Sequence, residues 1–405
     1  MSQVIPSRHP AEPLPVPGVI RGFALALGLR RPDAGQFRHL GECLTVGDEP
    51  MDQLVEWMYS VGMSTAKPLF ERALADGIAS VQSPPEPLRA FFADLEAIPA
   101  WVDPDTLTRA ALVLRGGGSD GMYLARDVSL LGGYQFAGFN QTLLRTGALE
   151  KGSNTRFAET MKWAMDVISA DGLLPGTTGY RSTVRVRMIH SFVRRHVVAM
   201  PDWQPQLWGL PINQTDMAAT LVGSFIAPTT GGLGMGMLLP PSDLDAIAHL
   251  TRYTGWLLGV REEFLPHSFR DGVRVLYHTM TALATPDETT KQLAAPMVDD
   301  PLTWNYSRFP QLRRKLARSA HLSVTSAFLG PRAMRALGLP KAVPPWYPLV
   351  RIPVNITRSV TAQLVPGGME RAAARGEREN ATFLRTMTDA PTTIGGAVEG
   401  LVKSA

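Results

Sequence analysis

The segment 180–198, YRSTVRVRMIHSFVRRHVV, constrains the fold most, because it combines the periodicity of a buried helix with five arginines. Its apolar residues recur at spacings of three and four, as in a helix that neighbours enclose over much of its circumference. Arg187, His190 and Arg194 stand at i, i+3 and i+7 and therefore share one stripe of that helix. The segment must carry positive charge into or along a hydrophobic core.

Buried guanidinium groups need anions, and the pattern alone leaves the identity of those anions open. An inward-facing arginine is costly unless a carboxylate or another anion accepts its hydrogen bonds. Haem would supply partners for both residue types, because its two propionates can pair with arginines and its iron atom binds a neutral imidazole such as that of His190. The alternative is an internal lattice of salt bridges or a solvated face, with His190 satisfied by a backbone carbonyl.

The rest of the chain has the pattern of helix after helix, without convincing alternating strands, so we predict an all-α fold. The run 153–169 is a second amphipathic helix, on which Arg156, Thr160 and Trp163 share one stripe. The loop at 172–179 is short, which favours packing of this helix against the arginine-rich one. The two helices are therefore predicted to form the walls of one pocket.

Further along the chain, a helix is predicted up to residue 225, followed by a Gly- and Met-rich turn at 231–237. Proline is frequent near both ends of the chain, which indicates peripheral segments around a central unit. The predicted organisation is an N-terminal arm with the first helices at 1–50, a central domain at 51–335, and a Pro-rich C-terminal extension at 336–405 packed on the same domain.

Composition narrows the classes of function. Of the 405 residues, 45% are apolar and 19% are charged, as in a well-buried globular protein. The net charge is only +4, and no reading motif or aromatic platform accompanies the basic residues, so no nucleic-acid partner is expected. No signal peptide or hydrophobic span is recognisable, so we expect a cytoplasmic protein without a transmembrane segment.

Metal sites other than haem have little support in the sequence. Cys43 is the only cysteine, which is taken to exclude an intrachain disulfide and any cysteine-based zinc or iron–sulfur site. His190 and His196 are six residues apart and lie on different faces of a helix, and the other histidines show neither HxxxH nor facial-triad spacing. A non-haem metal centre is therefore not expected.

Four motifs together resemble one known family. They are RFAET at 156–160, RMIHSFVRR at 187–195, LPINQTD at 210–216 and YTGWLLGVREEFLP at 253–266. Their order and spacing resemble the haem-containing oxygenases of the latex-clearing-protein type, and more distantly the prenyl-cleaving oxygenase of mycophenolate biosynthesis. The resemblance implies a globin-like helical core with additional helices, which binds haem b and uses O₂ as co-substrate.

The resemblance also implies roles for the arginine-rich helix. His190 would be the proximal iron ligand, and Arg187, Arg194 and Arg195 would belong to the cofactor-binding side. The second ring nitrogen of His190 should donate its proton to a backbone carbonyl or another buried acceptor. Candidates for support of this side are Asn213, Gln214 and Asp216, and the favoured alternative is that Thr215 or Asp216 caps the following helix.

On the distal side, the resemblance implies that Arg156 and Thr160 belong to the catalytic helix. Two residues depart from the family pattern, because Glu159 stands where the family has a lysine and Asn140 where it has a glutamate. Glu159 or Asn140 would orient bound oxygen, and Glu159 would accept an allylic proton from the substrate. The implied catalytic set is therefore Arg156, Glu159, Thr160 and Asn140.

These inferences lead to an expected function and two alternatives. The resemblance implies a haem b-dependent oxygenase that cleaves C=C bonds of a polyisoprenoid, a smaller isoprenoid or another unsaturated apolar substrate with O₂. The first alternative is a non-catalytic sensor or carrier of haem or O₂, which the replacement at Glu159 motivates. The second is a helical protein without haem that binds lipid or a membrane surface. The sequence allows a homodimer.

Overall fold

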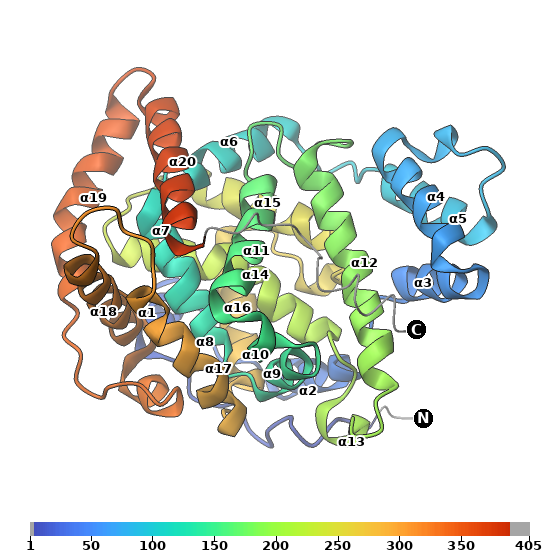
Figure 1. The fold of residues 1–405 in the computed structure, drawn as a ribbon, viewed down its shortest axis with the longest axis horizontal. Helices are drawn as coiled ribbons and strands as arrows, with labels where there is room; N and C mark the ends of the chain where they lie inside the picture. Colours follow the sequence, from blue (N-terminus) through green and yellow to red (C-terminus); the bar gives the residue numbers. More distant parts are fainter. Residues whose placement is uncertain (1–3, 389–405) are drawn as a thin grey trace.

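The computed structural model describes residues 4–388, apart from the side chains of Ala148 and Lys151, and every regular element in this part of the chain is a helix (Figure 1). This confirms the predicted all-α fold. The first elements are α1 (Gly18–Ala26), α2 (Ala34–Glu42), the 3₁₀ turn η1 (Cys43–Thr45), α3 (Glu49–Val61), α4 (Met63–Asp76), η2 (Ile78–Ser80), α5 (Glu86–Glu96), α6 (Pro104–Arg115) and α7 (Gly118–Leu124).

The middle of the chain supplies the elements around the candidate site. They are the π-helix η3 (Ala125–Leu130), α8 (Leu131–Gly133), α9 (Ala137–Arg145), α10 (Ala148–Lys151), α11 (Ser153–Val167), α12 (Thr178–Val198), α13 (Pro205–Trp208) and α14 (Gln214–Gly234). The remaining elements are α15 (Pro241–Leu257), η4 (Glu262–Phe264), α16 (Phe269–Leu283), α17 (Glu288–Asp299), η5 (Asp300–Leu302), α18 (Pro310–Ala336), α19 (Trp346–Leu364) and α20 (Gly368–Met387).

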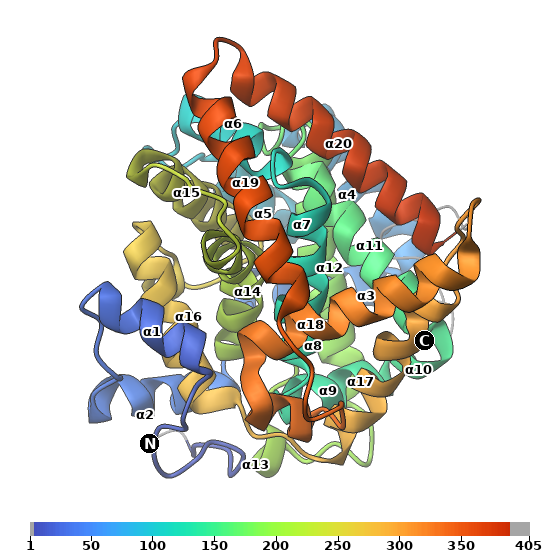
Figure 2. The ribbon, with the colours of Figure 1, turned by 90° about the vertical axis from the view of Figure 1, so that its left-hand side faces the viewer.

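Helix α14 runs through the middle of the molecule (Figure 2). Its buried apolar residues, such as Met217, Val222 and Phe225, are distributed around its circumference, and such a helix must be enclosed by others. Helices α7, α15 and α16 and the π-helix η3 pack against it. The helix continues to Gly234, so the turn begins only at Met235 and the sequence-based boundary was placed too early.

Helices α11 and α12 pack against each other, as predicted from the short loop between them. The indole nitrogen of Trp163 on α11 donates a hydrogen bond to Thr183 Oγ1 on α12 at 3.1 Å. Helix α12 begins after Thr177, whose hydroxyl accepts a hydrogen bond from the Tyr180 backbone N–H at 3.4 Å. On the other side of α12 stand α3, α4 and α5, which form a lobe at the side of the molecule (Figure 1).

Both ends of the described chain pack on this body. The Leu14 backbone N–H donates to Thr281 O on α16 at 2.9 Å, and α19 and α20 form a helical pair in which α20 packs on α6 and α7 (Figure 2). The last part of the predicted C-terminal extension, 389–405, lies outside the described residues. The predicted domain limits and the globin-like arrangement stay predictions. In residues 4–388, no helix has both the length and the hydropathy that a membrane span requires.

Candidate functional site

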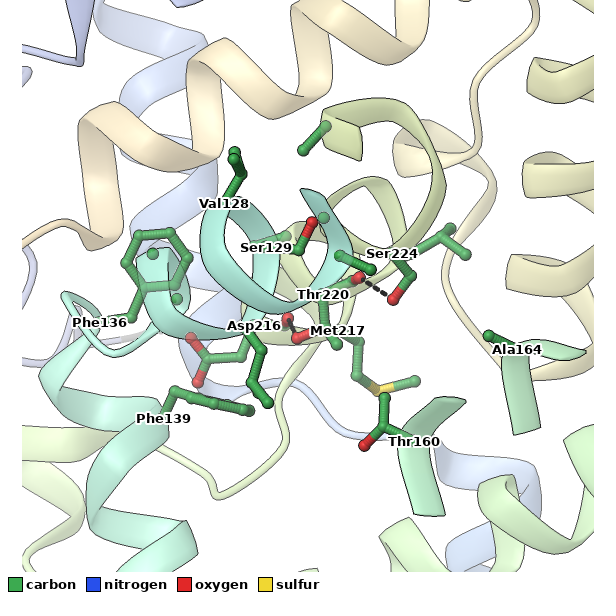
Figure 3. A pocket seen from close by; sticks show the side chains of 18 of the residues that line it. Val128, Ser129, Phe136, Phe139, Thr160, Ala164, Asp216, Met217, Thr220 and Ser224 are labelled. Atoms are coloured by element: carbon green, nitrogen blue, oxygen red, sulfur yellow. Dashed lines mark hydrogen bonds between the residues drawn. The ribbon is translucent and has the colours of Figure 1, made fainter. Parts of the chain in front are cut away.

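A cavity of about 470 Å³ lies between α11, α12, α14 and the segment from η3 to α9. Figure 3 shows side chains from several of these elements around the same space, with Val128, Phe136, Ala164 and Met217 supplying apolar wall. The volume is within the range of pockets that hold small molecules or cofactors, and apolar walls are typical of them. The cavity is therefore the candidate functional site.

His190 on α12 lines this cavity. Its Nδ1 atom is buried and has no hydrogen-bond partner, and neither ring nitrogen bonds to any residue that the structure describes. Burial, and to a lesser degree the neighbouring charge of Arg194, lowers the pKa of His190 to about 4. The ring is therefore neutral at neutral pH, with a lone pair available to a metal ion. The acceptor that the sequence analysis expected for its second nitrogen is absent among residues 4–388.

The arginines of α12 find their anions in carboxylates of the neighbouring lobe. Arg187 forms a bidentate pair with Asp48, in which the Nε–Oδ2 distance is 2.6 Å and the Nη2–Oδ1 distance is 2.7 Å. Both side chains are buried. The other pairs are Arg194 with Asp52, Arg195 with Glu56 and Arg185 with Glu71.

These pairs form the internal lattice of salt bridges that the sequence left open as the alternative to a cofactor. Arg187, Arg194 and Arg195 are not among the described residues of the cavity wall. Carboxylates of the protein neutralise all three, so their predicted place on the cofactor-binding side stays a prediction without support from contacts to the cavity. Arg194 still supports the histidine, since its Nη1 donates to the His190 carbonyl oxygen at 3.5 Å and to the Ile212 carbonyl oxygen at 3.3 Å.

Three of the four predicted catalytic residues meet at the cavity, because Arg156, Glu159 and Thr160 all line it from α11. Arg156 Nη1 donates to the hydroxyl of the buried Tyr134 at 3.2 Å, and its guanidinium carbon lies 5.9 Å from the centroid of that ring. Arg156 makes no ion pair with a carboxylate in the described part of the chain. Its charge is therefore available to an acidic group of a ligand.

Asn140 lies behind the cavity wall and not in it. Its Nδ2 donates to the Tyr134 carbonyl oxygen at 2.7 Å and to Thr289 Oγ1 at 3.1 Å, and the side chain is fully buried. This amide ties α9 to the start of α17. Its predicted contact with bound oxygen is not supported by this position.

The motif at 210–216 supports the start of α14 and does not touch His190. Asn213 caps the helix, because its Oδ1 accepts from the Asp216 backbone N–H at 3.0 Å, whereas Thr215 and Asp216 were the predicted caps. Gln214 Nε2 donates to the Gly47 carbonyl oxygen at 2.9 Å. Asp216 also lines the cavity, where Arg8 Nη2 binds its Oδ2 at 2.6 Å.

Sequence reasoning missed several polar residues of the cavity, and Ser129 is the one among them whose hydroxyl is buried without a partner in the described structure. It lies on the π-helix η3, and its buried Oγ has no hydrogen-bond partner in the described structure. In Figure 3 its hydroxyl is drawn in the same cavity as Thr160 and Thr220. A π-helix has no sequence signature of its own, although it is frequent at functional sites. The nearby Gly132 and Gly133 were the only available signal.

Three comparisons with known proteins identify the family. Residues 122–364, more than half of the chain, match the family model described as ER-bound oxygenase mpaB/B'/Rubber oxygenase, catalytic domain. The Rubber oxygenase of Streptomyces sp. (strain K30) is 24% identical over 186 residues, and this match spans 45% of the chain and only 45% of that protein. The structure of Latex Clearing Protein LCP in the closed state shares the fold, with a TM-score of 0.56 and 18% identity over 89% of both chains. The chain therefore belongs to the mpaB/B' and rubber oxygenase catalytic-domain family.

Proposed function

We propose that this chain is a haem-dependent oxygenase that cleaves a C=C bond of an isoprenoid or another unsaturated apolar molecule with O₂. The observation that carries the proposal is the neutral imidazole of His190, with an unpaired and buried Nδ1, in the wall of a large apolar cavity. Because neither ring nitrogen bonds to a described residue, a nitrogen of this neutral ring is free to bind a metal ion. Membership of an oxygenase family agrees with this chemistry.

The residues of the cavity fit haem b. His190 offers the neutral nitrogen ligand that haem iron accepts, and the apolar walls suit the macrocycle. Arg156 offers a cation without an ion-pair partner in the described structure, which suits a propionate. When bound, haem supplies the O₂ chemistry that amino-acid side chains cannot provide.

The chain itself would then position the substrate and manage a proton. Apolar side chains such as Met217 and Phe136 would bind an unsaturated hydrocarbon and exclude water from it. The hydroxyl of Thr160 donates to the Arg156 carbonyl oxygen at 3.0 Å, so it would accept a hydrogen bond from a group in the cavity. A carboxylate oxygen of Glu159 would accept an allylic proton from the substrate, in place of the family's lysine.

Product analysis tests the proposed reaction. Reduced protein is incubated with O₂ and a panel of unsaturated isoprenoids of increasing length, and carbonyl products are trapped and identified by mass spectrometry. We expect aldehyde or ketone fragments from at least one chain length with wild-type protein and none with His190→Ala. A haem-loaded protein that yields no carbonyl product from the whole panel would contradict the oxygenase proposal.

The replacement of the family's lysine by Glu159 favours a second candidate, a sensor or carrier that binds haem and O₂ without turnover. The two candidates differ in the fate of O₂. A carrier releases O₂ unchanged when the pressure is lowered, whereas an oxygenase consumes it in proportion to substrate. Stoichiometric O₂ uptake measured with and without an isoprenoid therefore separates them.

The low pKa of His190 predicts an unusual acid stability of haem binding. The pKa of His190 is about 4, so the ring is neutral at mildly acidic pH and a proton does not compete for its ligating nitrogen there. We expect the haem absorbance to stay constant from about pH 8 to about pH 5.5 and to fall as the pH approaches 4, while circular dichroism reports whether the helices persist. A loss of absorbance centred near pH 6.5, with the helices intact, would contradict the account.

A further inference from the structure

A second group of metal-binding side chains lies outside the cavity, where the N-terminal helices meet η4. His39 on α2 and Cys43 at the start of η1 are one helical turn apart. Glu263 of η4 joins them from a segment far away in the sequence. Cys43 is buried, and the side chains of His39 and Glu263 are partly exposed, so the group is reachable from solvent.

The two distances from His39 to its partners match those around a tetrahedral metal ion. His39 Nε2 lies 3.5 Å from Cys43 Sγ and 3.4 Å from Glu263 Oε1, and the three candidate ligand atoms all lie within 4.8 Å of one another. Zinc bonds to nitrogen, sulfur and oxygen, set at tetrahedral angles, place nitrogen roughly 3.5 Å from sulfur and roughly 3.3 Å from oxygen. The histidine is thus already at ligand separation from both partners.

The orientation of His39 also suits a metal ligand. Its Nε2 faces the thiol and Glu263, while its Nδ1 lies 3.9 Å from Glu42 Oε2. In zinc-bound histidines the far ring nitrogen usually donates to a carboxylate, which fixes the ring and raises the basicity of the ligating nitrogen. At 3.9 Å the Glu42 carboxylate lies near this position without a hydrogen bond to the ring. Phe264 stacks on the ring at a centroid distance of 6.0 Å.

We propose that His39, Cys43 and Glu263 bind one Zn²⁺ ion, with a water molecule as the fourth ligand. One thiolate, one imidazole and one carboxylate form a donor set that zinc accepts. The exclusion of a cysteine-based zinc site, drawn above from the presence of a single cysteine, is thereby withdrawn. This site is separate from the cavity, and the proposal does not depend on the oxygenase function.

Zinc at this site would stabilise one part of the cavity wall. Zinc would tie α2 and η1 to η4, and the same loop carries Leu258 and Val260, which line the cavity. Burial and the charge of Glu263 raise the pKa of the Cys43 thiol to about 11, so zinc binding would release its proton to solvent. Arg261 Nε lies 3.4 Å from Glu263 Oε1, and its positive charge partly offsets the rise in the Cys43 pKa, so zinc must displace it.

The test measures zinc in the full-length protein. We expect about one zinc per chain by mass spectrometry after zinc loading and desalting, and one sulfur ligand at about 2.3 Å in zinc-edge X-ray absorption. Zinc should also slow the reaction of the only thiol with a disulfide reagent, and a chelator should restore the fast rate. Each of Cys43→Ser, His39→Ala and Glu263→Gln should weaken zinc binding at least about tenfold.

His267→Ala provides the matched control. His267 Nε2 also lies 3.4 Å from a carboxylate, Glu262 Oε1, but no thiol is near this pair. This variant should bind zinc as the wild type does, and Glu263→Gln, which changes only a partly exposed side chain, should keep the helical circular dichroism. Three results would overturn the proposal: no bound zinc, bound zinc without a sulfur ligand, or an equal loss of zinc in His267→Ala. If no zinc binds, Arg261 is the cation that neutralises Glu263.

Discussion

Replacing His190 by alanine is expected to remove haem from the protein. The ring is the one neutral nitrogen ligand that the described structure presents to the cavity, and its Nδ1 has no competing hydrogen bond. Loss of groups that only orient a metal ligand costs 10- to 100-fold in affinity, so removal of the ligand itself should cost on the order of 100-fold or more. The measurement is the haem content and the Soret absorbance of the purified variant.

His196→Ala is the matched control, because His196 lies on the same helix, six residues away, and is not part of the described cavity wall. It should keep the full haem content. Since the His190→Ala substitution removes an unpaired buried group, the helical circular dichroism should also persist in that variant. An unchanged Soret band in His190→Ala would show that the ligand assignment is wrong.

Replacing Asp48 by asparagine is expected to destabilise the fold by about 3 kcal/mol. The change leaves the Arg187 guanidinium charged and buried without its carboxylate, and removal of one partner of a buried ion pair costs about 3–5 kcal/mol. The amide keeps the shape and part of the hydrogen bonding, so we expect the lower end of that range. The measurement is the free energy of unfolding from urea titration.

An exposed ion pair provides the comparison for this prediction. Glu86 and Arg89 also form an ion pair, but both side chains are more than half exposed, at 68% and 61%. Such pairs contribute at most about 1 kcal/mol, so Glu86→Gln should leave the free energy of unfolding nearly unchanged. Equal effects of Asp48→Asn and Glu86→Gln would mean that the lattice on α12 is not buried in solution.

The helices were predictable where their pattern is local. The spacing of apolar residues by three and four predicted α11 and α12 within a few residues of their observed limits. The short loop between them predicted that they pack together. Helix α14 was predicted too short, because its last turns consist of Gly231, Gly232 and Gly234, which normally indicate a turn. Here glycine is explained by close packing between helices and not by a turn, since a Cβ atom at Gly231 would lie 2.7 Å from Leu124 Cδ2.

Site residues that share one helix were predictable from the sequence, whereas contacts between residues far apart in the sequence were not. The stripe of Arg156 and Thr160 on α11 lines the cavity, as expected. The anions of the α12 arginines stayed open between a cofactor and protein carboxylates, because nothing local in the sequence connects Arg187 with Asp48, which precedes α3. The group of His39, Cys43 and Glu263 was invisible for the same reason, since only the fold brings Glu263 to the other two.

The measurement that tests the central proposal most directly is one absorption spectrum of the purified full-length protein, oxidised and then reduced with dithionite. The account predicts a Soret band that shifts on reduction, at a stoichiometry of about one haem per chain, because His190 is a neutral ligand in a cavity that suits haem. A protein that is colourless as purified and stays colourless after incubation with haem would contradict it.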